Sequence, residues 1–176
     1  MQALMSFESA PPYAAPLRFF LTAPLFAVLA GLLIAFEGPD IFVSRWMPAV
    51  LAVTHLLTLG FMLQMMLGAL IQILPVVAGA NLPRPLLLAT IVHAGLTSGA
   101  LLLVGGFYFG LPVLLNSAAV LLALTVLVFL AAALQALIGV PSTSPTIRGL
   151  KLAMFSLLIV IALGVVMALA MANGWP

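Results

Sequence analysis

Five long apolar runs dominate this sequence and leave it few ways to fold. Each run holds about 20 or more residues that are mainly Leu, Ala, Val, Ile, Met and Phe, and charged or Pro/Gly-rich breaks separate them. About 20 such residues are needed for one helix to cross a hydrocarbon layer of about 30 Å, and a helix satisfies its own backbone hydrogen bonds in lipid. The sequence therefore predicts an all-α, polytopic membrane helix bundle that lies in a lipid bilayer as a single transmembrane domain, residues 1–176.

The breaks predict five transmembrane helices, at about 17–36, 47–77, 86–109, 113–140 and 152–171. The second would span about 46 Å, so we expect it to tilt, to project from the membrane or to bend near Pro75. The fourth is almost uniform Leu, Val and Ala, which predicts a lipid-facing helix. The polar PSTSPTIRGLK segment before the fifth is predicted to be a loop.

The charged residues exclude several classes of protein. With 66% hydrophobic residues, five Lys and Arg and three Asp and Glu, the chain cannot cover a soluble surface with polar groups. The basic residues stand singly at helix ends and form no patch, so no nucleic acid is expected as a partner. The three carboxylates all lie outside the membrane core, which gives no pair for acid–base catalysis, and the sequence assigns no catalytic residue.

The same basic residues predict the orientation of the chain. Arg18, Arg84, Arg148 and Lys151 fall on one side of the expected membrane, and Arg45 alone falls on the other. Because short loops rich in Lys and Arg stay in the cytoplasm, the N-terminus is predicted to be cytoplasmic.

His55 is the first candidate site residue, because it lies inside the apolar second run. An ionisable side chain costs several kcal/mol in hydrocarbon unless it finds a partner, so a histidine there indicates function. The chain has no cysteine, which excludes thiolate metal sites, iron–sulfur clusters and covalent haem and leaves imidazole, thioether and oxygen ligands. The alternative is a neutral histidine that is hydrogen-bonded to a neighbouring helix.

Two methionines follow His55 on the same predicted helix face. At about 100° per residue, Met62 and Met66 project within about 20° of His55, and Gly60, Gln64 and Gly68 project on the opposite side. Thioether side chains mould to a flat apolar ligand such as haem, although ordinary core filling also explains them. The two glycines would let another helix approach closely, and Gln64 and Gln72 could then bond across helices.

His93, in the third run, is the second candidate. Both histidines are predicted near the bilayer middle, about 12 Å below Met47 and about 10 Å above Leu86, with a vertical offset of roughly 8 Å. That offset permits a shared copper or zinc site of His55 and His93. The alternative is that His93 only hydrogen-bonds Thr90 or Thr97 on its own helix.

A family resemblance rests on the second run. The series His55, Gly60, Phe61, Gly68, Pro75 and Gly79 resembles the corresponding helix of the NnrS family, haem-containing bacterial membrane proteins linked to nitrosative stress, and LRFFLTAPLFAVLAGLL is similar to their first helix. The match covers about the first 85 residues. More remotely, the pattern is similar to the first two helices of haem-copper oxidase subunit I, where a second-helix histidine binds haem.

The resemblance implies haem b, with its iron, as the cofactor, a bacterial inner membrane location and His55 as a haem ligand. Together with the helix projection and the predicted depths above, it makes His55, His93, Met62 and Met66 the candidate cofactor-binding residues and the two histidines the candidate metal ligands. Larger relatives arrange about twelve helices as a pseudo-threefold ring of four-helix units, so this shorter chain is expected to form a homo-oligomer, with a trimer favoured. The third run lacks a His-His pair and no Tyr neighbours a ligand histidine, so oxidase activity is not carried over and copper is the weaker alternative to haem.

Three functions stay open at this point. The leading hypothesis is a small b-type haem protein concerned with electron transfer or a diatomic gas such as NO or O₂, served by a redox partner. The second is a cofactor-free structural or accessory membrane subunit. The third is a small copper or zinc protein built on the two histidines.

Overall fold

The structure is a computed structural model that describes residues 10–142 and 144–174, and within these ranges the chain forms helices and no strand. Five helices are long and apolar enough to cross a membrane, which confirms the all-α, multi-pass bundle. They are α1 (Ala14–Glu37), the continuous span of α2 (Pro48–His55), η3 (Leu56–Leu63) and α3 (Gln64–Ala78), then α4 (Pro85–Phe109), α5 (Pro112–Leu137) and α6 (Pro145–Asn173). A short 3₁₀ helix, η2 (Pro39–Val43), connects α1 to α2.

Prolines and glycines mark the ends of these helices. A proline stands in the first turn of α2, α4, α5 and α6, where its fixed φ suits a helix and its missing N–H costs nothing. Gly79 and Gly110 follow α3 and α4 with φ of 65° and 64°, the left-handed conformation in which glycine closes a helix without strain. These residues explain why the sequence predicted most helix bounds to within a few positions.

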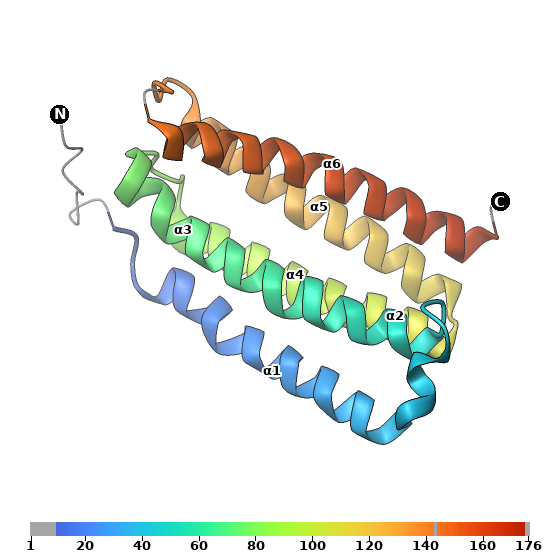
Figure 1. Ribbon diagram of the computed structural model, residues 1–176. Helices are drawn as coiled ribbons and strands as arrows, with labels where there is room; N and C mark the ends of the chain where they lie inside the picture. Colours follow the sequence, from blue (N-terminus) through green and yellow to red (C-terminus); the bar gives the residue numbers. More distant parts are fainter. Residues whose placement is uncertain (1–9, 143, 175–176) are drawn as a thin grey trace.

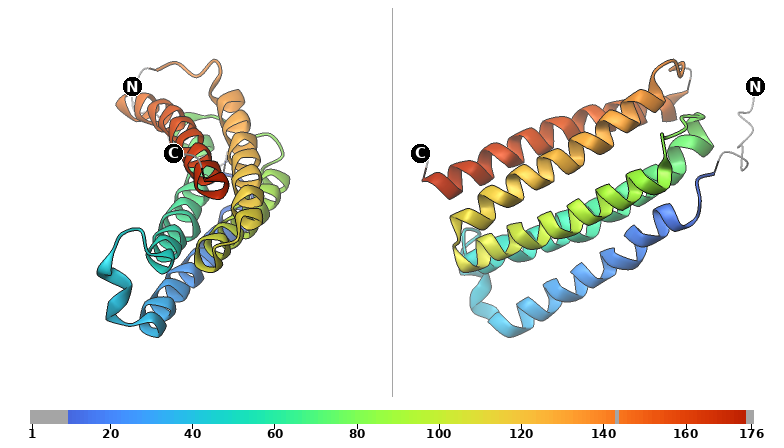
Figure 2. Two further views of the ribbon diagram at one scale, coloured as in Figure 1. Left: turned by 90° about the vertical axis from the view of Figure 1, so that its right-hand side faces the viewer. Right: turned by 180° about the vertical axis from the view of Figure 1, so that it is seen from behind.

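The helices lie side by side, with α1 at one edge of the bundle and α6 at the other (Figure 1). The span α2–α3 and helix α4 pack between them, and α5 bridges α4 to α6, as the rotated views also show (Figure 2). Apolar side chains face outward along most of this surface, for example Leu25, Leu124 and Leu163 at about 60% exposure. A lipid bilayer is the solvent that such a surface requires.

The prediction that the fourth helix faces lipid is wrong. Half of the residues in the most apolar window of α5 are buried inside the protein, compared with 11% in α6. Alanines on α5 let it lie against α4 on one side and α6 on the other, with Ala118 and Ala133 fully buried. The burial of α5 could not be predicted from its sequence, because periodicity does not distinguish a buried helix face from a lipid-facing one when both are apolar.

The last helix begins earlier than predicted, at Pro145 in place of residue 152, and α5 ends at Leu137 in place of residue 140. The Oγ of Ser144 accepts a hydrogen bond of 3.3 Å from the N–H of Ile147, and Pro145 occupies the first turn. A Ser-Pro pair is a helix start signal in its own right. The basic side chains of this turn reach back to the loop, and Lys151 Nζ donates to Val140 O at 2.8 Å.

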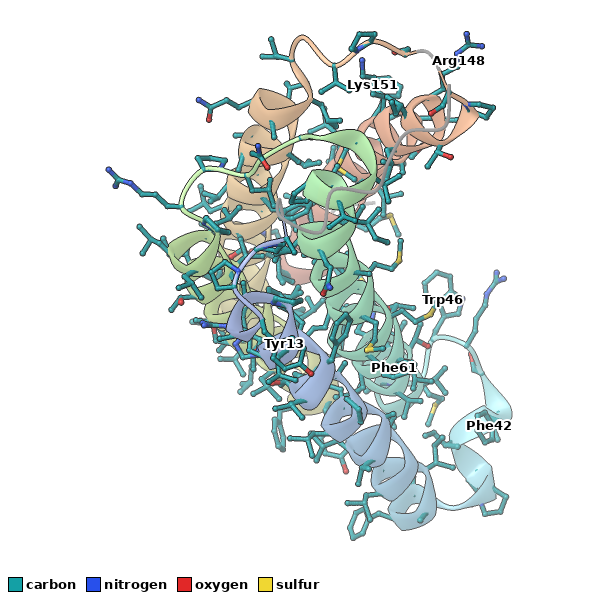
Figure 3. All side chains as sticks on the ribbon, turned by 90° about the vertical axis from the view of Figure 1, so that its left-hand side faces the viewer. Tyr13, Phe42, Trp46, Phe61, Arg148 and Lys151 are labelled. Carbon is teal, nitrogen blue, oxygen red and sulfur yellow. The ribbon has the colours of Figure 1, made fainter. Side chains whose placement is uncertain are left out.

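The two ends of the bundle differ in charge. The N-terminal segment and the α3–α4 and α5–α6 connections share one end, and the α1–α2 and α4–α5 connections share the other (Figure 1). Arg148 and Lys151 belong to the first end, whereas the exposed Phe42 and Trp46 belong to the α1–α2 connection (Figure 3). This grouping is the one from which the cytoplasmic N-terminus was predicted, and that orientation stays a prediction.

Candidate functional site

His55 is held in one orientation by two contacts. Its Nδ1 lies 2.7 Å from the carbonyl oxygen of Leu51, one turn earlier. A carbonyl only accepts, so Nδ1 carries the proton and Nε2 keeps a free lone pair. The ring lies against Phe107 of α4, with 4.7 Å between ring centroids and an angle of 31° between the planes. A neutral imidazole fixed through Nδ1 is the form in which histidine binds a metal ion.

A π-helical segment begins immediately after His55. Residues Leu56–Leu63 form η3, with its wider turn, between the α-helical segments α2 and α3. The sequence predicted that the long second span would tilt, project or bend near Pro75; instead Pro75 lies within α3, and the irregular segment adjoins the histidine. Such segments are rare and are found frequently at functional sites.

The methionines lie on the outer surface of this span. Met62 and Met66 are 54% and 55% exposed, and with the exposed Thr54 and Thr58 they form a stripe of residues four apart. His55, next to Thr54 in the chain, is half-buried at the border of this stripe. We call Thr54, Thr58, Met62 and Met66 the outer stripe.

The opposite side of the span packs on α1, as the two glycines predicted. A Cβ atom on Gly60 would overlap the ring of Phe26, and one on Gly68 would lie 2.9 Å from the Cβ of Phe19. Gln64, between them, is fully buried and donates to Thr97 of α4 at 3.3 Å. The predicted close approach and the hydrogen bond of Gln64 across helices are confirmed, whereas Gln72 is exposed and bonds no other helix among the described residues.

His93 hydrogen-bonds a side chain of another helix, and not Thr90 or Thr97 of its own helix. Its Nε2 lies 2.8 Å from Thr22 Oγ1 of α1. The Thr22 hydroxyl already donates to Arg18 O at 2.8 Å, so it accepts from His93 Nε2–H. The side chains of Thr90 and Thr97, the partners expected on the same helix, are bonded to Arg18 and Gln64. His93 therefore joins α4 to α1.

The two histidines are not brought together within one chain. His55 contacts Phe107, which lies 14 residues along α4 from His93. At about 1.5 Å per residue, the two sites are about 20 Å apart along the helix, well beyond the offset of roughly 8 Å expected from the sequence. The difference arises because His55 lies near the α1–α2 end of the bundle, while His93 lies nearer the opposite end. One chain cannot place both imidazoles on one ion.

Other metal-binding or acid–base clusters are absent from residues 10–142 and 144–174, where no three His, Cys, Asp or Glu side chains gather. Glu37 accepts a hydrogen bond of 2.6 Å from the hydroxyl of Tyr108 and so ties the end of α1 to the end of α4. This contact positions the helices near Phe107 and is not itself part of a site.

Sequence reasoning missed two residues that define the surroundings of the histidines. Phe107 is one of several aromatic residues at the end of the third run and was not a candidate, yet it is buried and packs on His55. Thr22 carries a weak signal, since it and Arg18 are the two polar side chains in the first apolar run. A polar residue there needs a partner in a neighbouring helix, and that requirement could have pointed to His93.

Comparisons with protein-family models, with curated protein sequences and with solved structures give no match to this chain.

Proposed function

We propose that this protein is a small b-type haem protein of a bacterial inner membrane, in which His55 Nε2 is an axial ligand of the iron. The observation that carries the proposal is the state of His55: its Nδ1–H is fixed on Leu51 O at 2.7 Å and its Nε2 lone pair is free. The resemblance of the second span to the NnrS family points the same way. Electron transfer or the binding of a diatomic gas is the activity that a single haem would provide.

The surroundings of His55 fit the face of a porphyrin. Phe107 presents a flat apolar ring beside the imidazole, and Met62 and Met66 provide adaptable thioether side chains along the outer stripe. When bound, haem supplies reversible one-electron and gas-binding chemistry. The chain's own contribution is to orient the imidazole and to surround the ligand with apolar groups.

One chain supplies the ligand but does not enclose the cofactor. An apolar cavity of about 270 Å³, lined by residues that include Leu56, Val104 and Tyr108, lies between α1, η3 and α4, but His55 does not line it, and cofactor sites reach about 1,000 Å³. A second copy of the chain, packed over the outer stripe, would complete the enclosure. The resemblance favours a homotrimer in which helix α2–α3 faces the centre.

Two further functions remain as candidates. A copper or zinc site shared by His55 and His93 would need the histidines of two different chains, because within one chain they are about 20 Å apart. A cofactor-free accessory subunit would give a colourless, metal-free protein that still folds and assembles.

The absorption spectrum of the protein, purified from cells supplied with haem, tests the proposal. We expect a Soret band and α-band from wild type, loss of both in His55→Ala, and no change in His93→Ala, which serves as the matched histidine control. The paramagnetic resonance spectrum of the ferric protein should also be unaffected by His93→Ala, because that imidazole bonds Thr22. A colourless wild type, or an unaltered His55→Ala spectrum, would remove His55 from any haem site.

A further inference from the structure

A ladder of three polar side chains runs along α4 toward the middle of the membrane. Thr90, His93 and Thr97 are three and four residues apart, so they lie on one side of the helix. Successive members rise by about 4.5 and 6 Å along the axis. Thr90 is exposed, His93 and Thr97 are half-buried, and the ladder leads inward from the end that carries the N-terminus.

Each member of the ladder is bonded to another helix. Arg18 Nη1 donates to Thr90 Oγ1 at 2.6 Å, and His93 Nε2 donates to Thr22 Oγ1 at 2.8 Å. Because Nε2 holds the proton in a neutral imidazole, Nδ1 of His93 is an acceptor. We call the contact of α4 with α1 and α3 along Thr90, His93 and Thr97 the seam. It has hydrogen-bond donors and acceptors on successive turns of α4.

The inner end of the ladder is incompletely bonded. Gln64 is fully buried, and its Oε1 has no hydrogen-bond partner among the described residues. Exchanging the amide oxygen and nitrogen would move the unpaired atom without removing it. The hydroxyl of Thr90 donates to Leu86 O, one turn earlier, at 2.8 Å. Among the bonds of the described chain, Thr97 Oγ1 only accepts, from Gln64. Thr97 O–H and Gln64 Oε1 are thus a free donor and a free acceptor side by side.

Water is the ligand that such a pair requires. A buried unpaired amide oxygen has lost its hydration without gaining a hydrogen bond, and an ordered water that makes two or more hydrogen bonds removes that cost. Two hydrogen bonds of about 2.8 Å let one water join polar atoms up to about 5.6 Å apart, which covers the rise of about 4.5 Å from Thr90 to His93, whereas the rise of about 6 Å from His93 to Thr97 needs a second water. The spacing of the seam suits a short chain of waters.

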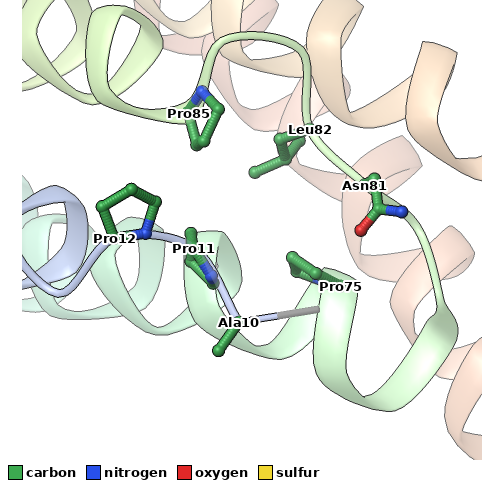
Figure 4. Close-up of a pocket in the computed structure, with 7 residues that line it drawn as sticks. All are labelled: Ala10, Pro11, Pro12, Pro75, Asn81, Leu82 and Pro85. Carbon is green, nitrogen blue, oxygen red and sulfur yellow. The ribbon is translucent and has the colours of Figure 1, made fainter. Parts of the chain in front are cut away.

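A cavity lies at the outer end of the same three helices. It has a volume of about 160 Å³ and lies between the segment before α1, Pro75 of α3 and the α3–α4 connection (Figure 4). Asn81 provides a polar group in its wall, and the other lining residues are Ala10, Pro11, Pro12, Leu82 and Pro85. This end of the seam belongs to the aqueous side of the membrane that carries the N-terminus.

We propose that Gln64 Oε1 and Thr97 Oγ1 bind an ordered water, and that further waters follow the half-buried side of the Thr90–His93–Thr97 ladder to Arg18, at the end of the bundle that also holds the cavity. His93 then exchanges its proton with the aqueous compartment at the Arg18 end, while lipid-facing residues at the same depth stay dry. The path does not involve His55, so its test gives the same answer whether or not the protein binds haem.

The absence of native cysteine allows a direct test by single-cysteine labelling. We would reconstitute Thr97→Cys and Ser98→Cys in liposomes and follow their modification by methanethiosulfonate ethylammonium through the intact mass. Ser98 is the matched control, because it is the next residue, at the same depth, but is exposed on the lipid side of α4. Only a thiolate reacts, and a thiol in hydrocarbon does not ionise.

We expect Thr97→Cys to react at least an order of magnitude faster than Ser98→Cys, and a second change, Gln64→Leu, to slow it. Equal rates, or two thiols that react only after unfolding, would overturn the proposal. If Thr97→Cys does not fold, solid-state NMR of the unaltered protein decides: magnetisation transferred from water should reach the Gln64 side-chain amide, and a dry amide would contradict the hydrated path.

Discussion

At the scale of single residues, one of the closest approaches between helices depends on a missing side chain. Gly60 of η3 lies so close to Phe26 of α1 that a Cβ would overlap the aromatic ring. Gly60 follows His55 by five residues on the same continuous span, so this contact also helps to position the histidine.

We therefore predict that Gly60→Ala lowers the free energy of unfolding by about 1–3 kcal/mol, the usual cost of overpacking. Gly31→Ala is the control, because no atom lies within 4 Å of its added Cβ. That change should be neutral or stabilise the protein by up to about 1 kcal/mol, since alanine favours a helix more than glycine does. Unfolding titrations in detergent would measure both, and equal stabilities of the two variants would argue against this packing.

At the scale of helices, the π segment Leu56–Leu63 is the departure from regular structure that matters most for the site. A wider turn contains an extra residue relative to an α-helix, so one deletion can restore the regular turn without moving the flanking segments. Deletion in a regular helix instead rotates every later side chain by about 100°.

We predict that deleting Leu57, which is 37% exposed, destabilises the protein much less than deleting the exposed Leu101 from α4, and leaves haem binding intact because the segments that flank η3 keep their positions. Circular dichroism during thermal unfolding, together with the absorption spectrum, would compare the two. Greater damage from the Leu57 deletion would show that the π segment is not an accommodated extra residue.

Helix identity and most helix ends followed from the sequence, because long apolar runs, prolines and glycines act locally. Three features did not follow. The burial of α5 depends on which neighbours cover it, the π segment has no compositional signature in LLTLGFML, and the contact of His55 with Phe107 is set by how two antiparallel helices align. Each is a property of packing between segments distant in sequence, which hydrophobic periodicity does not contain.

At the scale of the whole molecule, the exposed outer stripe is the surface on which assembly is proposed. We predict that Met62→Trp reduces the homotrimer to smaller species, because the larger ring would clash with a neighbouring copy. Leu163→Trp on α6, at a similarly exposed position, should leave assembly intact, since lipid accommodates the change. Native mass spectrometry in mild detergent distinguishes the outcomes, and a wild-type monomer that retains haem would refute the assembly.

The central claim is that the imidazole of His55 itself binds the iron, and chemical rescue tests it most directly. His55→Gly leaves space at the end of the Leu51 carbonyl where free imidazole can bind in the place of the side chain. We predict that the purified variant lacks the haem absorption bands and that imidazole and haem added together restore them, whereas His93→Gly needs no rescue. A His55→Gly protein that keeps the wild-type spectrum without imidazole would contradict the account.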